Sequence, residues 1–308
     1  MNYFKCIEKL PSGLRIRRLL ETIWAELTFA QSCAPGHFYS PIPSRKEIEQ
    51  DSQRIFGTGK RQLPEICLNE QNQISLLNRL ATHSTYLKLP ELPIDGRRFY
   101  LKNDYFAFAD AVVLATMLLE FKPRRYLEIG SGFSSALVLD IRDHYLAGQL
   151  ECCFVEPSDT RLKSLLNGDD TKTATILTER VQNVDDSIFQ ALEAGDILFV
   201  DGSHVSKVGS DLNDIVFRVL PLLRPGVMVH FHDILWPFEY ARADVLLGRS
   251  WNEAYLIRAF LANNSDYEIV LFPSWLENSH PIEWIRALPE ASRSKASSFW
   301  IRKLGPAS

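Results

Sequence analysis

The spacing of apolar residues divides the chain into a helical first third and a longer part in which short apolar runs alternate with amphipathic segments. Apolar residues recur at helical intervals over residues 13–30, 47–56 and 71–83, which predicts three helices separated by proline-rich breaks. No strand is predicted there. We therefore expect residues 1–100 to be a helical appendage, acting as a lid or an interface, and residues 101–308 to be the main domain.

The main domain begins with a long apolar helix predicted over 104–121. Strands are then predicted over 125–129, 151–155, 175–177, 196–200 and 227–232, and helices over 134–145, 160–166, 187–193 and 205–222. Two further strands are predicted over 268–272 and 298–302. Strands that alternate with helices form parallel sheets with right-handed crossovers. We expect an α/β fold with a Rossmann-like doubly wound sheet, mostly parallel and with an antiparallel last strand.

The most informative segment is the turn after the first strand, Glu128-Ile129-Gly130-Ser131-Gly132. Glycines remove side chains from the turn, so that backbone N–H groups at the start of the next helix can face an anionic or polar ligand. The second strand ends in Glu156, where an acid can accept both hydroxyls of a ribose. The spacing indicates an adenosine compound.

Two nucleotide classes compete for this turn. A dinucleotide-binding turn reads G-x-G-x-x-G/A, which Gly130, Gly132 and Ser135 fit only loosely. A carboxylate at Glu128 would repel a pyrophosphate but suits a ligand with an ammonium and a sulfonium group. At this E-x-G-x-G run the chain resembles the class I methyltransferases, which use S-adenosylmethionine (SAM), and the resemblance spans about residues 100–303.

The ends of the fourth and fifth strands carry a second polar cluster. Asp201-Gly202-Ser203-His204 puts a carboxylate and an imidazole on one turn, and His230-Phe231-His232-Asp233 ends the neighbouring strand. Alternation along a strand places His230 and His232 on one face. Ligands of open α/β sheets bind beyond such strand ends. Asp201, His232 and Asp233 are thus placed to converge on a divalent metal that would polarise a substrate hydroxyl.

These two segments resemble the metal-assisted small-molecule O-methyltransferases, above all a bacterial group that shares the D-G-S-H and H-D-I pieces and the later Trp251-Asn252-Glu253 stretch. The resemblance implies transfer of a methyl group to a hydroxyl of a sugar or natural product. It makes His204 the base and Asp201, His232 and Asp233 the metal ligands, for Mg or Mn. Histidine at position 232, where an acid is common in that group, favours softer metals.

The same resemblance assigns the cofactor site. Glu128 would orient the methionine amino group, Glu156 would hold the ribose, Val184 would pack on the adenine, and Gln182, Asn183 or Asp185 would bond its edge. The candidate cofactor residues are Glu128, Gly130, Gly132, Ser134, Glu156, Gln182, Val184 and Asp201. The candidate catalytic residues are Asp201, His204 and Asp233.

Each of these residues also has a plain structural interpretation. Asp201 can cap the following helix, His204 can be a solvated loop residue, and His230 can be a core histidine. Asn252 and Glu253 can be the N-terminal residues of a helix. An aromatic run can either floor an acceptor pocket or pack on the core. It comprises Trp236, Phe238 and Tyr240.

The composition of the chain argues against some classes of binding partner. A formal net charge of −4 gives no field that favours nucleic acid or an anionic membrane. The five cysteines have no metal-site spacing, no apolar run has the length of a membrane span, and no signal peptide is recognisable. We expect a cytoplasmic enzyme and leave a homo-oligomer open. The alternatives are a non-catalytic protein that binds SAM or S-adenosylhomocysteine (SAH), and an NAD-dependent Rossmann oxidoreductase.

Overall fold

The computed structural model describes residue 20 and residues 33–57 and 62–305. The helix expected over 13–30 lies outside these residues, apart from Leu20. The chain divides into two compact units, Met1–Gly57 and Thr58–Ser308, whereas the sequence placed a boundary near residue 100.

In the first unit, the structure has two short helices, α3 (Arg45–Gln50) and α4 (Ser52–Phe56), where one helix was expected over 47–56. The Ser44 side chain caps α3 by accepting a hydrogen bond from the Glu47 N–H, and Asp51 separates the helices.

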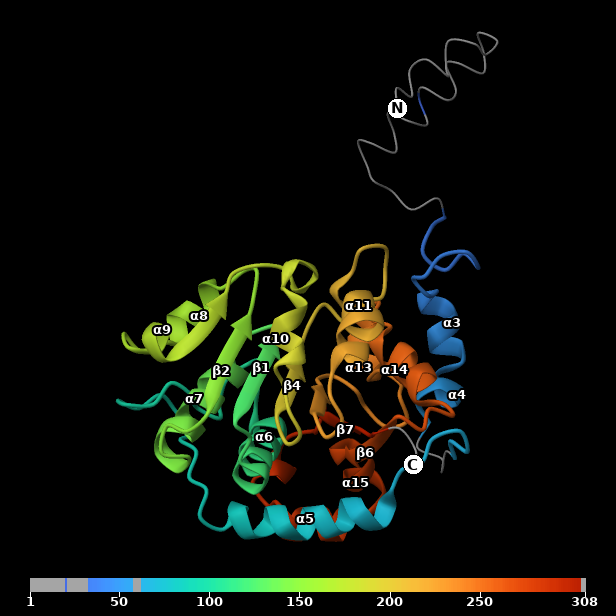
Figure 1. Cartoon of the computed structure of the whole chain (residues 1–308). Coiled ribbons are helices and arrows are strands. Elements are labelled where there is room, and N and C mark those ends of the chain that lie inside the picture. Colours follow the sequence, from blue (N-terminus) through green and yellow to red (C-terminus); the bar gives the residue numbers. More distant parts are fainter. Residues whose placement is uncertain (1–19, 21–32, 58–61, 306–308) are drawn as a thin grey trace. The chain divides into compact units, whose positions relative to one another are not determined.

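The second unit is built on a seven-stranded sheet with the order β3-β2-β1-β4-β5-β7-β6 (Figure 1). The strands are β1 (Arg125–Ile129), β2 (Glu151–Val155), β3 (Ala174–Leu177), β4 (Ile197–Val200), β5 (Met228–Phe231), β6 (Tyr267–Leu271) and β7 (Phe299–Lys303). All pairs from β3 to β5 are parallel, and β7 is antiparallel to both β5 and β6. The predicted Rossmann-like doubly wound sheet with an antiparallel last strand is confirmed.

The helices of this unit fall into two groups whose members contact one another. The first contains α5 (Glu70–Ser84), α6 (Phe108–Phe121), α7 (Phe133–Tyr145) and α8 (Thr160–Leu165), and the second contains α10 (Asp186–Gln190) and the helical run 211–222. That run consists of α11 (Asp211–Asp214), a π-helical turn η2 (Ile215–Val219) and α12 (Leu220–Leu222). The remaining elements are α9 (Asp170–Thr173), η1 (Val181–Asn183), α13 (Arg242–Leu246), α14 (Glu253–Leu261), α15 (Pro273–Ser279), α16 (Pro281–Ala287) and η3 (Ala291–Arg293).

Two helices begin later than their apolar pattern predicted, because polar side chains hold the preceding residues in turns. The Asn103 carboxamide oxygen accepts the N–H groups of Tyr105 and Phe106, which delays α6 to Phe108. The helix expected over 205–222 begins at Asp211, since the Ser210 hydroxyl caps it through the Asn213 N–H. Residues 205–210 are therefore a loop beside the carboxyl end of β4.

Residues 62–101 contribute to the same core as the sheet. Leu76, Leu77 and Leu80 of α5 are buried in it. Before α6, the Arg98 guanidinium forms ion pairs with Asp140 (3.0 Å), Asp143 (2.8 Å) and Asp170 (2.6 Å), and its side chain is 7% exposed. This cluster ties the segment before α6 to α7 and α9.

Among the described residues, no helix combines the length and the apolar character that crossing a bilayer demands.

Candidate functional site

The glycine turn joins the ends of β1, β2 and β4. Gly130 has φ +85° and donates its N–H to the Val155 carbonyl, 3.0 Å away. A Cβ atom on Gly130 would lie 1.8 Å from the backbone oxygen of Asp201. Only glycine can occupy this position, because the backbone conformation and the close approach both exclude a side chain. The turn therefore packs directly against the backbone of Asp201.

Glu128 lies beneath this turn and is fully buried. One carboxyl oxygen accepts the Ser134 hydroxyl, while the other, Oε2, has no hydrogen-bond partner within the described structure. Burial, only partly offset by hydrogen bonds from Ser134 and Ser135, raises the pKa of Glu128 to about 8. A buried acceptor without a partner is costly, and an ammonium group bound beside it would supply the missing donor.

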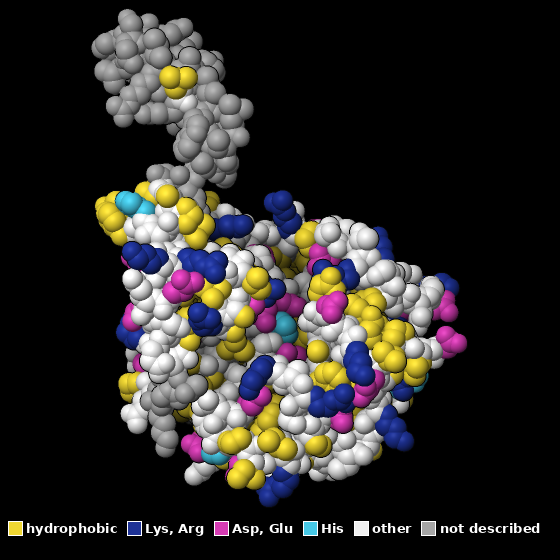
Figure 2. All heavy atoms as spheres, turned by 180° about the vertical axis from the view of Figure 1, so that it is seen from behind, with side chains coloured by type: hydrophobic (Ala, Val, Ile, Leu, Met, Phe, Trp, Pro, Cys, Tyr) yellow, Lys and Arg dark blue, Asp and Glu magenta, His cyan; other side chains and the backbone are white. Residues whose placement is uncertain are grey.

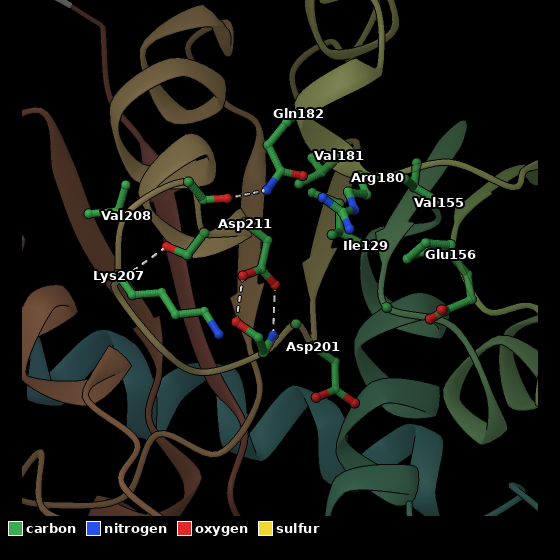
Figure 3. Close-up of a pocket in the computed structure, with 16 residues that line it drawn as sticks. Ile129, Val155, Glu156, Arg180, Val181, Gln182, Asp201, Lys207, Val208 and Asp211 are labelled. Carbon is green, nitrogen blue, oxygen red and sulfur yellow. Dashed lines mark hydrogen bonds between the residues drawn. The ribbon is translucent and has the colours of Figure 1, made fainter. Parts of the chain in front are cut away.

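A cavity of about 560 Å³ opens beyond the carboxyl ends of β1, β2 and β4 (Figure 3). Glu156 lines one side, where its carboxylate accepts the N–H groups of Ser131 (3.0 Å) and Ser158 (2.7 Å). Gln182 and Val181 line another side, and the Gln182 amide donates to the Gly209 carbonyl of the 205–210 loop. Val184 is buried and does not line the cavity, since the turn η1 carries it into the core.

Four side chains form a closed ring at the ends of β4 and β5. His204 Nε2 lies 3.4 Å from Asp201 and 3.5 Å from Asp233, and His232 Nδ1 lies 3.6 Å from each of the same carboxylates. Figure 2 shows acidic side chains around a histidine in a hollow of the face turned to the viewer. The backbone at His204 (φ +59°) and Asp233 (φ +57°) is left-handed. Such backbone strain at non-glycine residues clusters in functional sites.

Each imidazole of this ring is held from behind by a buried acid. Glu253, the first residue of α14, binds His204 Nδ1 at 2.7 Å. Asp110 of α6 lies 3.6 Å from His232 Nε2 and also accepts hydrogen bonds from the backbone and hydroxyl groups of Ser297 and Ser298. The ring nitrogens that face Asp201 and Asp233 are thereby fixed.

The charges of the ring reinforce one another. Burial disfavours the imidazolium of His204, but hydrogen bonds to Asp201 and Glu253 outweigh it and raise the pKa of His204 to about 10. Burial also disfavours the imidazolium of His232, but the charges of Asp201 and Asp233 outweigh it and raise the pKa of His232 well above its usual value. For Asp233, the two imidazoles overcome burial and lower the pKa to about 2. Both histidines are thus cationic at neutral pH.

The ring fits a divalent metal poorly. Among the described residues, no group of three or more His, Cys, Asp or Glu side chains is arranged to hold one. The His232 nitrogen that a metal would need, Nδ1, faces Asp201 and Asp233 at 3.6 Å, and its other nitrogen faces Asp110 and Ser297. The two imidazoles, whose pKa values are both raised, thus lie against the carboxylates where the metal was expected.

Several neighbouring residues have structural roles. His230 is fully buried, and its ring stacks on Phe199 at 3.9 Å. Phe238 packs on Phe272 and Phe299 in the core. Trp251, by contrast, packs on the ring of His204, with 4.6 Å between the centroids.

Three residues of the site were not assigned to it from the sequence. Glu253 was expected only as a helix N-terminal residue, and Asp110 and Asp211 were not singled out. The Asp211 carboxylate accepts the Ser203 N–H at 2.7 Å and its hydroxyl at 2.5 Å, which shapes the turn that carries His204. A sequence signal existed for Glu253 alone, through the Trp251-Asn252-Glu253 stretch. Asp110 and Asp211 had none, because their contacts join residues of separate elements.

Comparison with known proteins adds the family. Residues 127–234 match the model of a family described as a methyltransferase domain. An uncharacterized protein of Archaeoglobus fulgidus is 32% identical over 164 residues, a match that covers 52% of this chain and 73% of the archaeal one.

Solved structures resemble the chain more distantly. The SAH-bound methyltransferase PaMTH1 of Podospora anserina has a TM-score of 0.42 at 13% identity and covers 86% of this chain and 99% of its own. The O-methyltransferase TomG of Streptomyces achromogenes, in complex with SAM, has a TM-score of 0.38 at 14% identity and covers 84% and 96%. These likenesses are too weak to carry a conclusion about activity.

Proposed function

We propose that this chain, which belongs to one family with the Archaeoglobus protein and carries a methyltransferase domain over residues 127–234, is a class I SAM-dependent methyltransferase. Its proposed reaction is methylation of a hydroxyl oxygen of a small molecule. One observation carries the proposal. Two carboxylates from the ends of adjacent parallel strands face the Nε2 atom of His204, at 3.4 and 3.5 Å. A base is thus placed next to the glycine turn, where proton removal and methyl transfer can be coupled.

The residues of the glycine turn fit the cofactor. The unpartnered Oε2 of Glu128 suits its ammonium group. Glu156, Val181 and Gln182 line the cavity; Glu156 is the proposed acceptor for the ribose hydroxyls, and Val181 and Gln182 are the proposed neighbours of the adenine. When bound, the cofactor supplies an electrophilic methyl group on sulfur, which needs no protein nucleophile. The protein contributes mainly by orienting the acceptor for in-line attack.

His204 is the proposed base, and Glu253 is its positioning residue. Glu253 binds Nδ1, so that Nε2 is the nitrogen that faces the acceptor side. Because the pKa of His204 is about 10, only a small fraction of the ligand-free protein holds it neutral at pH 7. Transfer is therefore expected to speed up with rising pH, as more His204 becomes able to accept the proton.

A metal-assisted reaction is the alternative, with Asp201, His232 and Asp233 as ligands. We derive no step through a metal, because no group of three or more His, Cys, Asp or Glu side chains among the described residues is arranged to hold one. Turnover is expected to survive EDTA. Loss of turnover with EDTA, restored by Mg²⁺ or Mn²⁺, would establish the metal site instead.

The acceptor class rests on sequence resemblance, which points to a sugar or another natural product. We also propose that residues 1–100 act as a lid or as the interface of a homo-oligomer, and that the protein works in the cytoplasm. Sedimentation of the full chain with and without SAH separates a self-association role from a lid.

Calorimetric titration with SAM and SAH, with NAD as control, tests the proposal first. Micromolar binding of SAM and SAH alone is expected. An acceptor screen over monosaccharides and phenols, read as SAH formation, then uses Asp233→Asn and His204→Gln. Both variants should lose turnover while SAH affinity stays within a few-fold, and His144→Gln, an exposed site on α7, should change neither. Binding without turnover on any acceptor would favour a non-catalytic SAM-binding protein.

A further inference from the structure

A second, smaller hollow of about 180 Å³ adjoins the glycine turn on the side away from Gln182. Its lining comes from the segment before α6, the glycine turn with the start of α7, the ends of β2 and β4, and α8. It shares Gly130, Glu156, Asp201 and Gly202 with the larger cavity. The two spaces therefore lie next to each other at the strand ends.

Arg161 is the cationic side chain of this hollow. Its aliphatic stem passes over the turn, since a Cβ on Gly132 would lie 3.3 Å from Arg161 Cδ. Its guanidinium lies over the ring of Tyr105, 4.0 Å from the centroid, and that ring stacks on Phe133 at 5.7 Å. In the described part of the chain, no carboxylate forms an ion pair with Arg161. The guanidinium is thus oriented by an aromatic face but keeps its hydrogen-bond donors available.

Acidic side chains also line the hollow. Asp201 and Glu156 line it, and the unpartnered oxygen of Glu128 lies beneath the same turn. Glu156 is already engaged by two backbone N–H groups, and Asp201 faces the imidazoles of His204 and His232. The unpartnered oxygen of Glu128 is left for a cation. A guanidinium and an unpartnered carboxyl oxygen at one small polar space match a zwitterion, with its carboxylate toward Arg161 and its ammonium toward Glu128.

We propose that Arg161 binds the carboxylate of the cofactor's amino-acid end, with Tyr105 as the residue that positions the guanidinium. This inference rests on the proposed function, because it assumes that a SAM-type ligand occupies the cavity. Its consequence is selectivity: nucleosides that keep the amine but lack the carboxylate bind more weakly. The segment before α6, which carries Tyr105, thereby becomes part of the cofactor site.

Titration of the full chain with SAM, decarboxylated SAM and 5′-methylthioadenosine tests this. The wild type should bind SAM about 10-fold to 100-fold more tightly than decarboxylated SAM, as a charged hydrogen-bonded pair implies. Arg161→Met should remove that difference and leave affinity for 5′-methylthioadenosine unchanged. Arg161→Lys should restore part of it, and Tyr105→Leu should weaken SAM without affecting 5′-methylthioadenosine.

Arg180→Met is the matched control, since Arg180 is also exposed and lines the larger cavity only. It should keep the full preference for SAM. Unchanged discrimination in Arg161→Met, with an unchanged melting temperature, overturns the assignment of Arg161 while leaving the proposed function intact. A wild type that binds none of the three ligands overturns the proposed function and this inference together.

Discussion

The Nδ1 atom of His204 lies 2.7 Å from a carboxylate oxygen of Glu253, although the two residues are 49 positions apart in the chain. This contact fixes the orientation of the imidazole and contributes to its pKa of about 10. If neutral His204 is the base, the rate of methyl transfer should rise about tenfold per pH unit below that value.

Glu253→Gln should shift the rising part of the pH–rate profile to lower pH, because removing the carboxylate lowers the pKa of His204. The plateau rate should fall by about tenfold or more, since the ring is less well held, while SAH affinity stays within a few-fold. A pH–rate profile measures both effects. Glu239→Gln changes a nearby acid that bonds Tyr255 rather than His204 and should leave the profile unmoved. An unshifted profile in Glu253→Gln would mean that another group limits the rate.

Glu128 should make cofactor binding depend on pH. Its pKa of about 8 means that the carboxyl is largely neutral at pH 6 and ionised above pH 8. Because the cofactor's ammonium group pairs with the ionised form, SAH affinity should increase between pH 6 and 8 and then level off. Glu128→Gln should bind weakly at every pH. Equal slopes in the two proteins would assign the dependence to another group.

The raised pKa of Glu128 should also make the stability of the ligand-free protein fall with rising pH, whereas cofactor affinity should rise. A raised pKa means that the folded protein keeps a proton that the unfolded chain releases above about pH 4.5. The stability that this proton contributes is present at pH 4.5 and is lost as the pH rises toward 8. The melting temperature of ligand-free Glu128→Gln should therefore fall less over this range than that of the wild type.

Gly130→Ala should disrupt the site far more than a conformational penalty alone explains. The new Cβ would meet the backbone oxygen of Asp201 at 1.8 Å, so that β1 and β4 must separate at their ends. Gly148→Ala is a matched control, since Gly148 has φ +75° with no atom within 4 Å of the added Cβ. It should cost only about 1 kcal/mol. Loss of SAH binding and a markedly larger fall in melting temperature are expected for Gly130→Ala alone.

Arg98→Met should destabilise the protein by about 3–5 kcal/mol, because it leaves buried carboxylates without their partner. The affected acids are Asp140 and Asp170, whose side chains are 2% and 3% exposed. Denaturant unfolding measures the loss. Arg124→Met removes an exposed arginine with a loose contact to Glu193 and should have little effect. Similar losses in both variants would show that the cluster adds no special stability.

Local patterns were sufficient to predict most of the sheet. The ranges of β1 and β2 agree with the sequence prediction, because a buried parallel strand is a continuous apolar run with clear ends. Helix starts were less accurate at Asn103 and Ser210, where side-chain bonds to the backbone override the apolar spacing. Strand ends also placed Asp201 and Asp233 together correctly in space.

Local sequence patterns could not predict the acids that contact the two histidines from behind. Asp110 sits within an apolar helix and meets its partners only when β5 and the 297–298 segment pack beside it. The metal expected at Asp201, His232 and Asp233 came from a likeness of sequence pieces and stays a prediction. That likeness did not include Asp110, which lies 3.6 Å from His232 Nε2.

The position of Glu253 at the start of α14 bears on how this enzyme can be redesigned. Trp251, two residues earlier, packs on His204, and the backbone of Asn252 and Glu253 donates to the His204 carbonyl. Grafting a foreign 234–252 loop to alter acceptor choice would thus also displace His204, the proposed base. Variation among natural relatives should be tolerated within the loop but constrained where it rejoins α14, so libraries for new acceptors are best confined to residues before Trp251.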